Sequence, residues 1–175
     1  MRQENLFLRS QLDGLNVSSS SDNQNLLPSS VYMSYPFNDK NLLVLGSGSE
    51  DNLVSNDAVV INRTLLGKVC EVFEHYSTFK TVFDPNWEFP VYIGPGLTRG
   101  LFKGGTEPKV VLISKKNKIE EGYLITTADP QDIPASLIIG TVGKITSDDS
   151  NPFWEITVDL PYNLNQVREV SILKK

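Results

Sequence analysis

Short runs of apolar and β-branched residues recur from Val31 to the end of the chain, and clusters of glycine, proline, asparagine and aspartate separate them. Valine, isoleucine, threonine and aromatic residues favour strands, whereas the separating residues favour turns. Many short strands without a longer helical pattern between them indicate a β-sandwich or β-barrel. The expected strands cover residues 42–45, 58–61, 68–73, 79–83, 91–93, 101–103, 110–113, 123–126, 137–141, 154–158 and 167–173.

One pattern occurs twice in this β region, first as Leu65-Leu66-Gly67-Lys68-Val69 and again as Ile138-Ile139-Gly140-Thr141-Val142. In each copy two apolar residues precede a glycine, and polar and apolar residues then alternate. Glycine permits the close backbone approach that is needed where a small barrel turns a corner. We therefore predict an all-β fold with two small β-barrels of similar construction, in which Gly67 and Gly140 are barrel corners.

The N-terminal residues 1–15 carry the apolar spacing of a short coiled coil, in which steps of four and three residues alternate. The seam consists of Met1, Asn5, Leu8, Leu12 and Leu15. We expect a short coiled-coil helix that forms a dimer through Asn5, Leu8, Leu12 and Leu15. The pattern is brief, and Leu6 and Phe7 lie off the seam, so a helix that packs on its own domain is the alternative.

The next segment, residues 16–30, is rich in serine and asparagine and has no apolar periodicity. Such a composition predicts a polar linker. The predicted organisation is therefore a helix over 1–15, a linker over 16–30 and a β domain over 31–175.

Composition and charge exclude several classes of partner. The formal net charge of −5 and the pI near 4.9 argue against binding to nucleic acid or adhesion to anionic lipid. The single cysteine, Cys70, allows neither an internal disulfide nor a cysteine zinc site. No segment has the roughly 18 apolar residues that indicate a membrane-crossing helix.

Catalytic groups are scarce in this sequence. His75 is the only histidine, so a Ser-His-Asp or Cys-His arrangement would have to use it. No Gly-x-Ser-x-Gly motif is present, and we expect His75 to lie on the surface. The acidic pairs Asp148-Asp149 and Glu120-Glu121 lack the ligand spacing of a calcium loop. The sequence therefore predicts no catalytic, cofactor or metal residue.

Aromatic residues are the remaining candidates for function, because they dominate binding energies where they are exposed. The segment 85–90 is bracketed by prolines and has the character of a loop, which makes Trp87 and Phe89 candidate partner contacts. Arg99, in a glycine-rich turn, is a third candidate.

Several sequence segments, taken in their order along the chain, resemble the MreC family of rod shape-determining proteins. The segments that carry the resemblance are 57–69, 77–84, 99–104, 121–128, 133–142 and 154–170. The sequence departs from the family pattern at turn residues, including Glu121-Gly122 and Ser136, where the family usually has Gly-Asp and glycine. The resemblance spans the chain from about Val31 to its end.

This resemblance implies a non-enzymatic scaffold of cell-wall elongation, without a cofactor. It implies a homodimer or higher oligomer whose partners are MreD, the MreB system and a class B penicillin-binding transpeptidase. It also implies a place on the extracytoplasmic face of the cytoplasmic membrane, through an N-terminal membrane helix that this sequence lacks.

Two other classes of function stay open at this point. A protease-like hydrolase on a double barrel would need a reactive serine near His75. A module that binds a small ligand or a glycan would need a deep apolar pocket lined by Trp87 or Trp154.

Overall fold

The computed structural model describes residues 26–32, 40–128 and 133–174. In these ranges the regular structure consists of β-strands and short 3-10 turns, so the expected all-β class is confirmed. The predicted coiled-coil helix over 1–15, with Asn5, Leu8, Leu12 and Leu15, lies outside the described residues.

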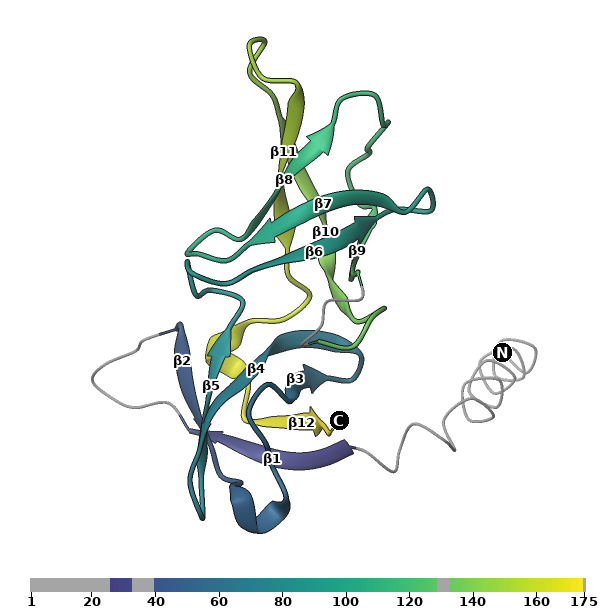
Figure 1. The fold of residues 1–175 in the computed structure, drawn as a ribbon. Helices are drawn as coiled ribbons and strands as arrows, with labels where there is room; N and C mark the ends of the chain where they lie inside the picture. The colour runs from purple at the N-terminus through teal and green to yellow at the C-terminus, as the bar shows by residue number, and fades with distance from the viewer. Residues whose placement is uncertain (1–25, 33–39, 129–132, 175) are drawn as a thin grey trace, which may run out of the picture.

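Apart from the first strand, which the sequence did not predict, the strands overlap the expected apolar runs, with ends shifted by up to five residues (Figure 1). In chain order they are β1 (Leu26–Tyr32), β2 (Leu42–Leu45), β3 (Ala58–Ile61), β4 (Thr64–Val72), β5 (Ser77–Thr81), β6 (Glu88–Ile93), β7 (Thr98–Lys103), β8 (Lys109–Ser114), β9 (Leu124–Thr127), β10 (Ile138–Thr146), β11 (Phe153–Asp159) and β12 (Glu169–Leu173). The 3-10 turns are η2 (Ser49–Asp51) and η3 (Leu164–Gln166).

Hydrogen bonding closes the strands into two rings. In the first ring the order is β4-β3-β12-β1-β2-β5, and β5 pairs back with β4. In the second ring the order is β11-β8-β7-β6-β9-β10, and β10 pairs back with β11. We call these rings the first and the second barrel. A closed ring leaves no unpaired strand at its edge, which removes the edge as a site of unwanted pairing.

The second barrel is inserted into the first along the chain. The strands β1 to β5 build most of the first barrel, β6 to β11 build the second, and β12 returns between β1 and β3. The barrels lie one above the other in Figure 1. One backbone pairing joins them, because Ile138 of β10 lies parallel to Thr64 of β4.

The β3–β4 hairpin contributes to two hydrophobic cores. Val59 and Leu66 pack in the core of the first barrel, whereas Val60 and Leu65 pack in the core of the second. Successive side chains of a strand point to opposite faces, so this hairpin is buried on both sides. Burial on both faces explains why residues 58–61 form an uninterrupted apolar run.

One boundary that the sequence suggested is wrong. Residues 26–30, which we assigned to the polar linker, belong to β1 and pair with β12. The segment contains Pro28, two serines and no apolar alternation, so its own composition does not favour a strand. Its partner strand comes from the far end of the chain, and that long-range pairing determines its conformation.

Candidate functional site

Gly67 and Gly140 occupy similar places in the two barrels. Each lies inside a nine-residue strand, β4 or β10, and each is buried. A Cβ atom on Gly67 would overlap the backbone oxygen of Lys80, and one on Gly140 would overlap the backbone oxygen of Asp159. Both glycines therefore stand where the neighbouring backbone leaves no room for a side chain.

The exposure that we expected for Trp87 and Phe89 is wrong. Their exposed fractions are only 5% and 4%. The Trp87 ring lies 4.9 Å from the Phe89 ring, which stacks at 4.6 Å on Phe102 of β7. The proline-bracketed segment leads directly into β6, and strand alternation turns Phe89 inward. These aromatic residues belong to the core of the second barrel, which also includes residues of β3 and β4.

Arg99 is exposed, as a contact residue must be. It lies opposite Tyr92 in the β6–β7 ladder, and its guanidinium carbon is 5.8 Å from the centre of the Tyr92 ring. The turn between these strands carries Leu97, whose side chain is 60% exposed. We call Tyr92, Leu97 and Arg99 the β6–β7 tip. The sequence analysis missed Leu97, although a leucine within a glycine-rich turn is itself a sign of exposure.

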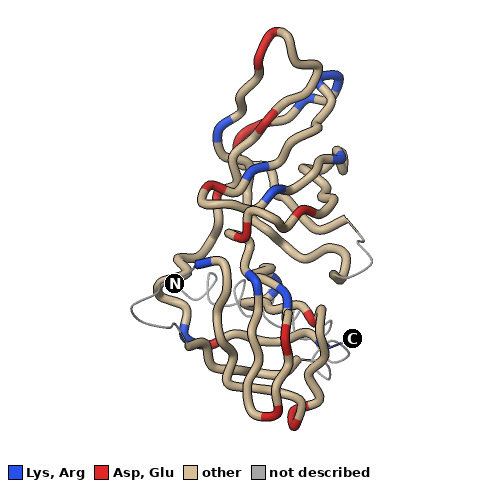
Figure 2. The backbone as a smooth tube through the Cα atoms, turned by 60° about the vertical axis from the view of Figure 1, so that its left-hand side comes forward, with Lys and Arg blue, Asp and Glu red and all other residues tan. Residues whose placement is uncertain are grey.

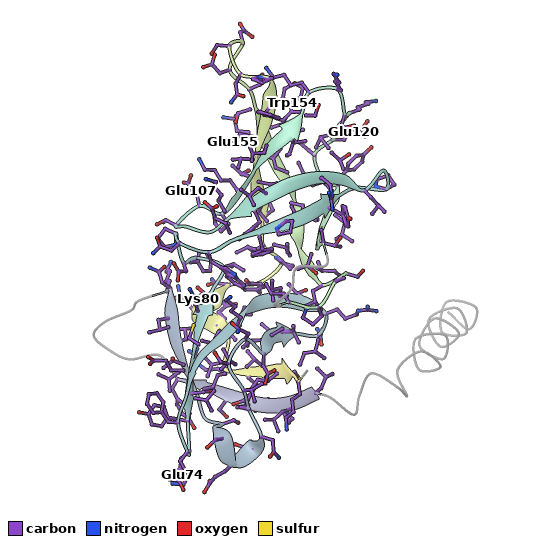
Figure 3. All side chains as sticks on the ribbon, in the orientation of Figure 1. Glu74, Lys80, Glu107, Glu120, Trp154 and Glu155 are labelled. Carbon is purple, nitrogen blue, oxygen red and sulfur yellow. The ribbon has the colours of Figure 1, made fainter. Side chains whose placement is uncertain are left out.

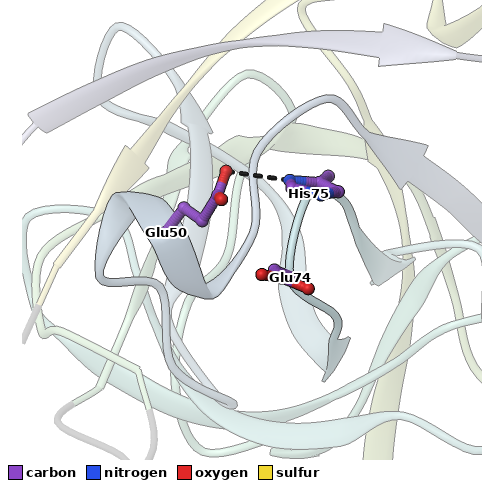
Figure 4. A group of neighbouring side chains, drawn as sticks. All are labelled: Glu50, Glu74 and His75. Atoms are coloured by element: carbon purple, nitrogen blue, oxygen red, sulfur yellow. Dashed lines mark hydrogen bonds and ion pairs between the residues drawn. The ribbon is translucent and has the colours of Figure 1, made fainter.

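His75 lies on the surface, as expected, in the turn between β4 and β5. Its Nδ1 atom is 2.8 Å from a carboxylate oxygen of Glu50, and its side chain is 70% exposed (Figure 4). Within the described ranges no hydrogen bond joins the imidazole to a serine hydroxyl or to the thiol of Cys70. The described residues therefore contain no assembled serine or cysteine protease centre around this histidine.

The two acidic pairs are exposed and do not converge on a site. Glu120 forms an ion pair with Lys118 at 2.9 Å, and this hydrogen-bonded lysine lowers the pKa of the Glu120 carboxyl. The backbone N–H of Ser150 donates a hydrogen bond to Asp148, which lowers the pKa of that carboxyl. These interactions stabilise the ionised carboxylates and are those of ordinary loops.

Neither tryptophan is among the residues that line two grooves on the described surface. Trp87 is buried in the core, and the half-buried Trp154 has the ammonium group of Lys115 5.5 Å from its ring centre. One surface groove lies along β10 and β11 in the second barrel, and its lining is mainly polar. The groove is lined by Glu121, Gly122, Thr141, Val142, Gly143, Lys144, Thr157 and Asp159.

Two closed barrels with adjoining cores define a double-barrel protein of the all-β class. The family model described as "Rod shape-determining protein MreC, barrel core" matches residues 31–174. This chain belongs to the MreC family, which is a structural, shape-determining family and not a known enzyme family. The resemblance seen in the sequence is thereby confirmed.

Solved structures of MreC proteins share the fold. The structure of MreC from Listeria monocytogenes has a TM-score of 0.83 and 18% identity, and the match covers 98% of this chain and 93% of that one. A structure of the major periplasmic domain of the cell shape-determining filament MreC has a TM-score of 0.69 and 22% identity, covering 84% and 93%.

A third structure is a complex between the penicillin-binding protein PBP2 and MreC from Helicobacter pylori. Its TM-score is 0.63 at 16% identity, and the match covers 86% of this chain and 99% of that one. None of the curated protein sequences compared with this chain matches it. In the described part of the chain, no helix has the length and apolar character that crossing a membrane requires.

Proposed function

We propose that this protein is a non-enzymatic scaffold of bacterial cell-wall elongation, which maintains cell shape by binding wall-synthesis proteins and membrane proteins linked to the cytoskeleton. The observation that carries the proposal is membership of the rod shape-determining family across 31–174. The absence of an assembled protease centre among the described residues agrees with a role in binding. No cofactor is part of the proposal.

The proposed partner is a class B penicillin-binding transpeptidase, on the extracytoplasmic face of the cytoplasmic membrane. The Helicobacter pylori complex of PBP2 with MreC supports this choice. MreD, the MreB system and a second copy of the chain are further proposed partners. In the proposed dimer, the seam residues Asn5, Leu8, Leu12 and Leu15 join the two copies. An N-terminal membrane helix would anchor the assembly.

We propose that the β6–β7 tip is one contact surface for the transpeptidase. Its apolar Leu97 and cationic Arg99 stand together at the end of a hairpin in a closed barrel, so they are presented on a rigid support. Because the backbone of this hairpin is already ordered, binding does not have to order it, and only the side chains lose freedom. Gly67 and Gly140 keep their proposed role as barrel corners that hold this surface in place.

The test is a binding measurement between this protein and the extracytoplasmic part of the transpeptidase encoded in the same genome. We expect Leu97→Asn and Arg99→Ala each to weaken binding at least tenfold. The backbone φ of Leu97 is 50°, a conformation that asparagine adopts readily, so the Leu97→Asn protein should stay folded. Val54→Asn is the matched control, because Val54 is 52% exposed on a loop before β3 of the first barrel.

Equal binding by Leu97→Asn, Arg99→Ala and Val54→Asn would reject the proposed contact surface. The scaffold function itself is tested separately, by depletion of the protein in its own rod-shaped host. Rounded cells are the expected result, and restoration of rods should require the wild-type chain. Cells that keep their shape and wall-synthesis rate after depletion would overturn the scaffold function.

A further inference from the structure

Side chains of the types that bind metal ions lie close together at one end of the first barrel. We call this the free end, because it is the end farthest from the second barrel. Figure 3 places Glu74 at the end of this barrel farthest from the second barrel, and Figure 2 shows acidic residues at that end. Glu50, Glu74 and His75 each offer one ligand atom there, and these atoms all lie within 4.8 Å of one another (Figure 4). The two carboxylates and the imidazole are not used by the proposed scaffold function.

The backbone brings these three side chains together. Glu50 lies in η2, whereas Glu74 and His75 lie in the turn between β4 and β5. The Ser49 N–H donates to the Phe73 carbonyl at 2.8 Å, and the Glu50 N–H donates to the Glu74 carbonyl at 3.3 Å. Two neighbouring hydrogen bonds therefore join η2 to the hairpin turn. This backbone contact fixes the positions from which the three side chains extend.

A glycine makes the contact between the two segments possible. A Cβ atom on Gly48 would overlap the carbonyl oxygen of Phe73 and come within 2.7 Å of the Tyr76 backbone nitrogen. On the other side of the turn, the Phe73 N–H donates to the Tyr76 carbonyl at 2.9 Å, and the Phe73 and Tyr76 rings stack at 4.6 Å. The turn that carries Glu74 and His75 is thus closed by its own flanking residues.

The donor set indicates which ion would bind. One imidazole nitrogen and two carboxylate oxygens suit Zn²⁺, whereas Ca²⁺ and Mg²⁺ prefer sites made wholly of oxygen. Bonds of about 2.0–2.2 Å to a tetrahedral Zn²⁺ place ligand atoms roughly 3.4 Å apart. The side chains of His75 and Glu50 are 70% and 58% exposed, so they are free to rotate to that spacing.

Electrostatics favour the binding of a divalent cation at this place. Glu50 and Glu74 bring two like charges together, and the imidazole pairs with only one of them, at 2.8 Å. A divalent cation would neutralise both carboxylates and replace this hydrogen bond with a metal bond. Three protein ligands would leave the fourth tetrahedral position for water or for a group of another molecule.

We propose that Glu50, Glu74 and His75 form a Zn²⁺ site at the free end of the first barrel, independent of the scaffold function. The test uses tag-free protein in a Cys70→Ser background, so that neither a tag nor the thiol competes for the ion. His75 is the only histidine in the chain, so its imidazole resonances are unambiguous in a proton–carbon correlation spectrum. Addition of Zn²⁺ should shift them saturably at one ion per chain.

The variants separate this site from binding elsewhere. His75→Ala should abolish saturable binding measured by calorimetry, and Glu50→Gln and Glu74→Gln should each weaken it at least tenfold. Glu107→Gln, a change at an exposed carboxylate in the second barrel, should have no effect. These substitutions are at exposed positions, and circular dichroism will show that the fold is kept.

Three results would overturn the proposal. The first is an unchanged His75 imidazole spectrum at millimolar Zn²⁺. The second is undiminished binding by the His75→Ala protein, and the third is an equal loss of binding in Glu107→Gln and Glu50→Gln. Rejection of the site in this way would leave the scaffold function untouched, because that function is measured by transpeptidase binding and cell shape.

Discussion

Replacement of Gly67 by alanine tests directly how closely the strands approach in the first barrel. The new Cβ would overlap the carbonyl oxygen of Lys80 and lie only 2.9 Å from its carbonyl carbon and from Cδ2 of Phe79. Carbon atoms pack best at about 3.5–4.0 Å, so β5 would have to move by several tenths of an ångström or more. Because β5 pairs with β2 on one side and with β4 on the other, it has no free edge toward which to move.

The cost of this substitution follows from the nature of the contact. Overpacking costs about 1–3 kcal/mol and occasionally more; we take about 3 kcal/mol or slightly more here, because backbone atoms of β5 must shift. Alanine also restricts the unfolded chain more than glycine does, and this effect alone raises the free energy of unfolding by about 0.4–1 kcal/mol. We therefore expect Gly67→Ala to lower the free energy of unfolding by about 2–3 kcal/mol. At roughly 2–4 °C per kcal/mol for a domain of this size, the melting temperature falls by about 4–12 °C.

Gly96→Ala is the matched control, since it makes the same change where there is space. The nearest atom to a Cβ on Gly96 is the Thr98 hydroxyl oxygen, at 4.0 Å. We expect this control to keep or slightly raise the melting temperature. Urea and thermal unfolding, followed by circular dichroism, measure both proteins. Equal midpoints for Gly67→Ala and Gly96→Ala would refute the close backbone approach.

Three further predictions concern the second barrel and the residues that pack against it. Gly140→Ala should lower the free energy of unfolding by about 2–3 kcal/mol in urea titrations, because its Cβ would overlap the Asp159 carbonyl oxygen; an unchanged midpoint would contradict this. Phe102→Ala removes a fully buried ring and should cost about 3–5 kcal/mol in the same assay, so a loss below about 1 kcal/mol would argue against the aromatic stack. Burial raises the pKa of the Tyr162 phenol above its usual value, so the folded protein holds this proton more tightly than the unfolded chain does. The contribution of Tyr162 to the free energy of unfolding is therefore intact below about pH 10, the pKa of a tyrosine in the unfolded chain, and falls as the pH rises above it. Tyr162→Phe should flatten that fall above about pH 10, and parallel pH profiles for the two proteins would count against the effect of the buried phenol.

The repeated glycine pattern shows which structural features the local sequence can predict in this protein. Two apolar residues before Gly67 and Gly140 indicated strands with a close approach, and the structure has nine-residue strands there with no room for a side chain. The signal is readable because only glycine fits such a position, so the constraint is visible in the residue type. The resemblance to the family followed from the order of several sequence segments along the chain.

The aromatic segment shows where local sequence fails. Trp87 and Phe89 stand between two prolines, a context typical of an exposed loop, yet they are buried at the start of β6. Their burial depends on the Phe102 ring of the neighbouring strand and on the core that they share with residues of the first barrel. None of these neighbours is specified by the sequence around residue 87.

The sequence by itself determined the all-β class, the positions of most strands, the two glycines and the family, because these depend on residue type and short-range alternation. The tertiary structure alone decided which strands close each barrel, that residues 26–30 form a strand, and that Glu50 meets His75 from 25 residues away. Each of these depends on pairing between distant segments. Short-range patterns favour a strand or a turn, but only the closed fold selects its neighbours.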